Sequence, residues 1–240
     1  MPQAKTLEVC IASLADALSA EQGGADRLEL NVALELGGLT PTAGLFQQVK
    51  QAVAVPVIVM IRPRGAGFCY SENERQLMLR DAELLLDLGA DGVASGALCD
   101  DQSLDVAFWT SLVQLAGACE TVFHRAIDAV ASPEELLVEL IDLGTTRVLT
   151  SGGSATALEG AVQIARLREI ADDKIEILPG AGVTADNIGE LMQRTGCDQV
   201  HGSFGVARGD AANGVVADTY PATSQDRVAA ARRALDALLG

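Results

Sequence analysis

Short hydrophobic runs alternate along the chain with longer segments in which apolar residues recur at helical spacing. The short runs have the length and the β-branched content of strands. Eight such runs begin at residues 6, 26, 55, 91, 121, 147, 175 and 199. Successive starts lie 20 to 36 residues apart, which is the size of one strand followed by one helix.

The segments between the runs carry helix start and stop signals. Ser71 followed by Glu74 has the spacing of a capping box, and Ser132 followed by Pro133 is typical of a helix start. Helices are therefore expected to follow the strands. Three glycines stand where helices should end: Gly89, Gly117 and Gly144.

Eight strand–helix units in 240 residues predict a single α/β domain over residues 1–240, folded as a (β/α)8 TIM barrel. A doubly wound open sheet is the main competitor, but no GxGxxG motif follows the first predicted strand. After the eighth strand we expect an irregular stretch over residues 205–223 and a last helix over residues 224–239. A loop of that length is often functional or an oligomer contact.

Alternation within the strands predicts which side chains face the barrel interior. In the first strand Leu7, Val9 and Ile11 form the face that packs on helices, so Glu8 and Cys10 face inward. These inward positions lie toward the C-terminal strand ends, where this fold carries its active sites. The other polar residues expected to face inward are Glu29, Asn31, Arg62, Arg64, His124, His201 and Ser203.

Two interpretations of these buried charges remain open. Glu8 and Glu29 with Arg62 could form a structural ion network, because buried charges are costly unless they are paired. Alternatively, they form a ligand pocket whose charges pair with each other until a small molecule binds. The only two histidines of the chain, His124 and His201, both fall at strand ends, and this favours a pocket.

Glycine-rich turns follow the last three strands, as TSGGSA, PGAGVT and HGSFG. Their backbone N–H groups suit an anion, and barrels of this type often bind phosphate at the loops after strands seven and eight. Glycine also serves simply to make tight turns. The ligand-binding candidates in these turns are Ser151, Gly152, Gly180, Gly182 and Ser203.

Charge and cysteine content narrow the classes of partner. Asp and Glu outnumber Lys and Arg by 33 to 17, which argues against nucleic acid and anionic membranes as partners. A local arginine cluster can still attract an anion within a Debye length of about 8 Å. The five cysteines form no CxxC pair, and no signal-type apolar stretch opens the chain, so we expect a cytoplasmic protein.

Seven segments resemble the CutC copper homeostasis family over nearly the whole predicted barrel. The resemblance implies a TIM barrel, a cytoplasmic homo-oligomer and copper handling, without a settled chemical activity. IRPRG and FHRA are its most specific motifs. The matching segments are EVC (8–10), GADRLEL (24–30), GGLTP (37–41), IRPRGAGFCYS (61–71), TVFHRAID (121–128), RVLTSG (147–152) and PGAGVT (179–184).

The resemblance also implies copper(I) ligands at the ends of the first two strands. The first of these positions is Cys10, whereas the second holds Asn31 where the family pattern has a cysteine. Because copper(I) prefers sulfur to an amide oxygen, we expect weaker copper binding than in a relative with both thiols. Met60 or Cys69 could supply a further sulfur at the same mouth.

Two classes of function follow. In the first, the pocket binds or passes on copper. In the second, the protein is an enzyme acting on a small anionic, possibly phosphorylated substrate that Arg62 holds together with the strand seven and eight loops. The catalytic candidates are Glu8 or Glu29 as base and His124 or His201 as proton carrier. A purely structural oligomer is a third interpretation, in which the pocket has no role.

Overall fold

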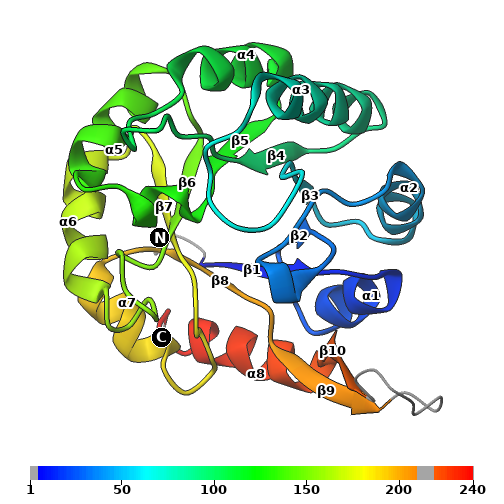
Figure 1. Cartoon of the computed structure of the whole chain (residues 1–240). Helices are drawn as coiled ribbons and strands as arrows, with labels where there is room; N and C mark the ends of the chain where they lie inside the picture. The colour runs from blue at the N-terminus through cyan, green and yellow to red at the C-terminus, as the bar shows by residue number, and fades with distance from the viewer. Residues whose placement is uncertain (1–4, 210–218, 240) are drawn as a thin grey trace.

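The computed structural model describes residues 5–209 and 219–239. Eight parallel strands form one sheet in the order β7-β6-β5-β4-β3-β2-β1-β8, and a bridge between Gly180 and His201 closes it into a barrel (Figure 1). The predicted (β/α)8 fold is confirmed. The strands are β1 (Thr6–Ile11), β2 (Arg27–Leu30), β3 (Val57–Met60), β4 (Gly92–Ser95), β5 (Glu120–Phe123), β6 (Arg147–Thr150), β7 (Glu176–Pro179) and β8 (Gln199–Gly202).

Helices alternate with the strands and surround the barrel (Figure 1). The expected capping box is present, because Ser71 and Glu74 exchange hydrogen bonds at the start of α3. The helices are α1 (Leu14–Gln22), α2 (Ala43–Ala52), α3 (Glu72–Asp87), α4 (Val106–Ala116), α5 (Pro133–Asp142), α6 (Ala161–Ala171), α7 (Ile188–Thr195) and α8 (Gln225–Asp236), with the 3-10 turns η1 (Leu34–Leu36) and η2 (Arg125–Ala129).

The apolar core lies in two layers on either side of the strands. Leu7, Val9 and Ile11 are fully buried in the layer between strands and helices, as their alternation predicted. The smaller layer fills the barrel interior below the mouth, as expected of this fold. Its members are Ile58, Met60, Ala94, Val122, Leu149 and Leu178.

The segment after β8 differs from the expected irregular stretch. Strands β9 (Gly205–Gly209) and β10 (Thr219–Thr223) pair antiparallel there, and in Figure 1 this hairpin lies beside the start of α8. The expectation missed the pairing because Gly, Arg and Pro in these short strands weaken any strand signal. The part of the expected stretch over residues 210–218 lies outside the described residues.

Candidate functional site at the barrel mouth

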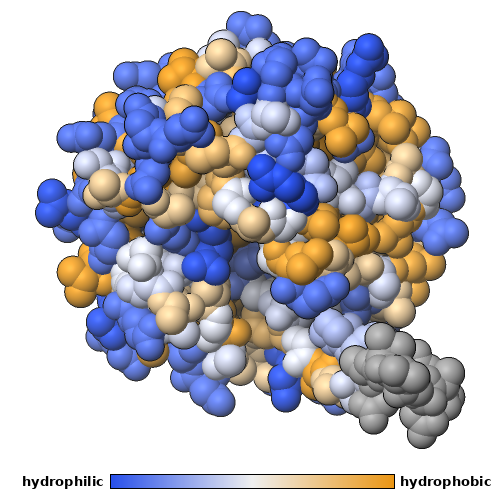
Figure 2. Space-filling view, viewed as in Figure 1, coloured by the Kyte–Doolittle hydropathy of each residue, from blue (hydrophilic) through white to orange (hydrophobic). Residues whose placement is uncertain are grey.

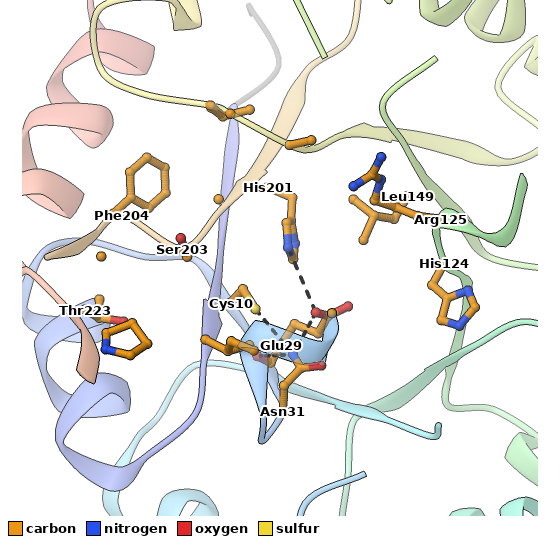
Figure 3. Close-up of a pocket in the computed structure, with 18 of the residues that line it drawn as sticks. Cys10, Glu29, Asn31, His124, Arg125, Leu149, His201, Ser203, Phe204 and Thr223 are labelled. Carbon is orange, nitrogen blue, oxygen red and sulfur yellow. Dashed lines mark hydrogen bonds and ion pairs between the residues drawn. The ribbon is translucent and has the colours of Figure 1, made fainter. Parts of the chain in front are cut away.

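A cavity of about 1320 Å³ opens at the C-terminal mouth of the barrel. Figure 2 shows it as a hollow near the centre of this face, and Figure 3 shows side chains from opposite strands pointing into it. Seven of the nine predicted inward residues therefore converge at one mouth, whereas Glu8 and Arg64 do not line the cavity. The predicted residues that line the cavity are Cys10, Glu29, Asn31, Arg62, His124, Gly182, His201 and Ser203.

Three of these residues come from adjacent strands and bring together three different ligand atoms. Cys10 on β1, Glu29 on β2 and His201 on β8 each offer one atom, and these atoms all lie within 4.8 Å of one another. The parallel register explains this, because Cys10 lies opposite Glu29 and His201 lies opposite Glu8, two residues before Cys10. A sulfur, a nitrogen and an oxygen donor can hold a metal ion together.

The imidazole of His201 is held between two carboxylates. Its Nδ1 lies 2.7 Å from Glu8 Oε1, and its Nε2 lies 3.9 Å from Glu29 Oε2. Burial opposes the charged ring, but Glu29, Cys10 and Glu8 outweigh it and raise the pKa of His201 well above its usual value. Glu8 does not line the cavity; it lies beneath His201 and orients its ring.

Asn31 connects the other two members of this cluster. Its Nδ2 donates to Glu29 Oε2 at 2.8 Å and lies 3.4 Å from Cys10 Sγ (Figure 3). Burial raises the pKa of both the Cys10 thiol and the Glu29 carboxyl. Gly38 covers Asn31 so closely that a Cβ there would lie 2.3 Å from Asn31 Oδ1. Asn31 therefore positions the two neighbouring groups.

Arg62 does not join an ion network with Glu8 or Glu29, so that interpretation is wrong. Its guanidinium donates to the carbonyls of Leu36, Gly38 and Ala66 at 2.9, 3.2 and 2.7 Å. It also lies over the ring of Phe68, with Cζ 5.2 Å from the centroid. Because β3 ends at Met60, the Arg62 side chain turns toward loop carbonyls instead of the carboxylates of β1 and β2.

The ion network of the barrel lies one layer deeper and uses residues that sequence reasoning missed. Arg27 pairs with Glu8 and donates to Gln199 at 2.8 Å. Arg147 pairs with Glu120 at 2.9 Å and with Glu176 at 2.6 Å. The alternation contained the signal, because Arg27 precedes Glu29 by two residues, as Gln199 precedes His201.

His124 stands on the opposite side of the cavity from the Cys10 cluster (Figure 3). Its Nδ1 accepts a hydrogen bond from Ala126 N–H at 3.2 Å, and its ring lies 5.0 Å from that of Phe68. Burial, followed by the charge of Arg62, lowers the pKa of His124 to about 3. The ring is therefore neutral at physiological pH.

The glycine-rich turn after β6 already holds an anion, which is the carboxylate of Asp128. Ser151 N–H and Oγ donate to Asp128 Oδ2 at 3.0 and 2.9 Å, and Gly153 N–H donates to Oδ1 at 3.1 Å. Thr150 Oγ1 adds a bond of 2.5 Å. Ser151 and Gly152 do not line the cavity, so this turn serves an internal anion.

The remaining ligand-binding candidates are Gly180, which lies behind the cavity wall, and Arg64, which lies outside the cavity. Gly180 supports the wall, because a Cβ there would lie 2.6 Å from Leu149 and 3.3 Å from His201. Arg64 does not face the cavity as expected; its Nε donates to Glu74 at 2.5 Å, since the strand alternation ends before it.

Of the two further residues that could supply a sulfur ligand, Met60 and Cys69, only the first reaches the cavity. Met60 lines the cavity. Cys69 is exposed, and its Sγ lies 3.1 Å from the carbonyl oxygen of Cys99, so it does not contribute to the cavity wall.

Comparison with known proteins shows which family the chain resembles. The model of the CutC family matches residues 5–206. A CutC family protein of Treponema denticola is 48 % identical over 81 % of this chain and 79 % of its own. The human copper homeostasis protein cutC homolog is 44 % identical over 81 % of this chain and 71 % of its own.

A solved structure agrees as well. The CutC structure from Streptococcus agalactiae has a TM-score of 0.79 and 32 % identity, covering 83 % of this chain and 98 % of the other. Its sequence identity is well above the 11 and 17 % of other solved structures that share only the fold with this chain. The chain therefore belongs to the CutC family.

Proposed function

We propose that this protein takes part in copper homeostasis in the cytoplasm by binding copper(I) at the barrel mouth through Cys10, His201 and Glu29. One observation carries the proposal: their three ligand atoms lie within 4.8 Å of one another. The name of the human relative, a copper homeostasis protein cutC homolog, supports it. The homo-oligomer implied by the family resemblance stays a prediction.

The donor set fits copper(I) better than the first two strands alone suggested. A thiolate and an imidazole are ligands that suit copper, and the carboxylate of Glu29 is a harder, weaker third donor. Asn31 then acts as a positioning residue, because its amide binds Glu29 and contacts Cys10. Glu8 accepts from the other ring nitrogen of His201, an arrangement that fixes the orientation of metal-binding histidines.

The test is a competition titration of copper(I) between the protein and a copper(I) chelator. We expect Cys10→Ser and His201→Gln each to weaken binding by about tenfold or more, whereas Cys69→Ser, at an exposed thiol outside the cavity, should leave it unchanged. Asn31→Cys should bind more tightly than the wild type, because it adds a second thiolate. Equal affinity of the wild type and Cys10→Ser would refute the proposal.

Catalysis on a small anionic substrate is the second candidate function. The size of the cavity favours it, because about 1320 Å³ is ample for an organic molecule and far more than one ion needs. In that function His201, held between Glu8 and Glu29, would be the proton carrier.

A further inference from the structure

Three buried side chains of the cavity wall carry a polar atom that lacks a hydrogen-bond partner within the described residues. One is Oδ1 of Asn31, beside the Cys10 cluster; the other two are Nε of Arg62 and Nε2 of His124, in residues that are 5 % and 4 % exposed. Leaving a buried polar group unpaired costs about 1–3 kcal/mol, and more for a charged group. The two groups of Arg62 and His124 on one cavity indicate that a bound ligand supplies their missing hydrogen-bond partners.

The charge of Arg62 is also uncompensated. No carboxylate of residues 5–209 or 219–239 lies within 4.0 Å of its guanidinium, and its three hydrogen bonds go to neutral carbonyls. Nη1 makes two of these bonds and Nη2 makes one. Nε and Nη2 share one edge of the planar group, which is the edge that binds a carboxylate through two parallel hydrogen bonds.

His124 supplies a neutral donor beside this charge. Because Nδ1 accepts from Ala126 N–H, the ring hydrogen resides on Nε2. The ring is fixed in place, since a Cβ at Gly96 would lie 2.6 Å from Nδ1. Arg62 and His124 both contact the ring of Phe68, so the cation and the neutral donor are neighbours on one wall.

We propose that this wall binds a small organic carboxylate. Arg62 takes the carboxylate, and His124 Nε2 donates to a keto or hydroxyl oxygen on the adjacent carbon. This subsite does not depend on the proposed copper function, because it shares no residue with Cys10, Glu29 and His201. It also differs from the turn after β6, which Asp128 already fills.

Tyr70 offers the alternative explanation. Its buried hydroxyl makes no hydrogen bond of ordinary geometry among the described residues, but it lies so near Arg62 that both the charge and the donor group of Arg62 oppose the burial that raises the pKa of Tyr70. A small rotation could pair Tyr70 with Arg62 and leave no role for a ligand. The Tyr70→Phe variant separates the two explanations.

The test is a titration of metal-free protein with sodium pyruvate, followed by NMR of [15N]histidine-labelled chain, with sodium chloride at matched ionic strength as reference. The chain contains only two histidines, so one spectrum reports both sites. We expect saturable shifts of the His124 ring nitrogens with pyruvate. Copper(I) should instead move the signals of His201, so failure of one proposal is distinguishable from failure of the other.

Substitutions test whether the carboxylate of pyruvate binds at Arg62. Arg62→Lys keeps the charge but loses the two-bond edge, and we expect about tenfold weaker pyruvate binding; Arg64→Lys, whose side chain lies outside the cavity, should bind as the wild type does. Tyr70→Phe should retain binding. Because Arg62→Lys could disturb the loops that it joins, the wild-type spectrum decides by itself: shifts no larger than with chloride, or shifts confined to His201, overturn the proposal.

Discussion

The two histidines of the barrel mouth differ in charge because their immediate neighbours differ. His201 lies between Glu8 and Glu29, which raise its pKa well above the usual value despite burial. His124 is surrounded by apolar groups and Arg62, so its pKa falls to about 3. The same residue type at equivalent strand ends therefore offers a cation in one place and a neutral donor in the other.

The low pKa of His124 predicts a pH dependence of stability. The unfolded chain binds a proton here near pH 6.5 whereas the folded chain does so only near pH 3, so stability is lost as pH falls through this range. The contribution is about 1.4 kcal/mol per pH unit. Urea unfolding should therefore show the wild type losing about 2 kcal/mol more than His124→Gln between pH 6.5 and 5; parallel losses would contradict the argument.

At the scale of the element, loops follow different rules from strands. Within β1, β2 and β8 the alternation of side chains places Cys10, Glu29 and His201 correctly. The turn after β6 and the turn η2 instead form a joint unit, in which the carboxylate of Asp128 in η2 accepts hydrogen bonds from backbone N–H groups of the turn after β6. Arg125, also in η2, pairs with Asp128 at 2.9 Å.

This unit predicts a large effect for Asp128→Asn. The substituted amide places a donor group against the N–H groups of Ser151 and Gly153, and it loses the charge that strengthens those bonds. We expect the free energy of unfolding to fall by about 2–3 kcal/mol, measured by urea denaturation. Asp101→Asn is the matched control, since Asp101 accepts from Ser103 N–H and Oγ in an exposed turn, and this substitution should lower the free energy of unfolding much less. Equal losses would refute the stabilising role given to the hydrogen bonds of Asp128.

At the scale of the whole molecule, polar contacts inside the barrel join distant parts of the chain. Glu8, Arg27 and Gln199 are linked side by side across β1, β2 and β8.

No helix in the described part of the chain has the length and apolar character to cross a membrane. The chain carries a formal net charge of −16, so its interior arginines lie in a protein that is strongly acidic as a whole.

The interior network predicts a strong effect of Arg27→Met on folding. Glu8 is 1 % exposed, and removing Arg27 leaves its carboxylate with His201 as its remaining charged partner. The expected loss is about 3–5 kcal/mol of unfolding free energy, measured by urea denaturation at pH 7. Arg194→Met, which breaks an exposed pair on α7, should change stability by less than about 0.5 kcal/mol. A loss for Arg27→Met as small as that of the control would show that His201 and the more distant charge of Arg147 suffice to stabilise the Glu8 carboxylate.

Local sequence patterns were enough to predict the eight strands, the barrel and the faces of its strands. These features depend on local periodicity, because the side-chain period of a strand is two and parallel strands bring their C-terminal ends to one mouth. Cys10, Glu29 and His201 could therefore be placed together before any contact was known. The resemblance of the sequence to the CutC family added copper as the expected ligand of this site.

Which polar groups pair with each other depends on the folded arrangement of the chain. Arg62 binds loop carbonyls, Arg64 binds Glu74, and the turn after β6 holds Asp128. Each choice depends on segments brought together by folding, where burial and distance select one partner among several of the right charge. Beyond the strand ends the alternation no longer constrains direction, so the partners of loop side chains could not be read from the sequence.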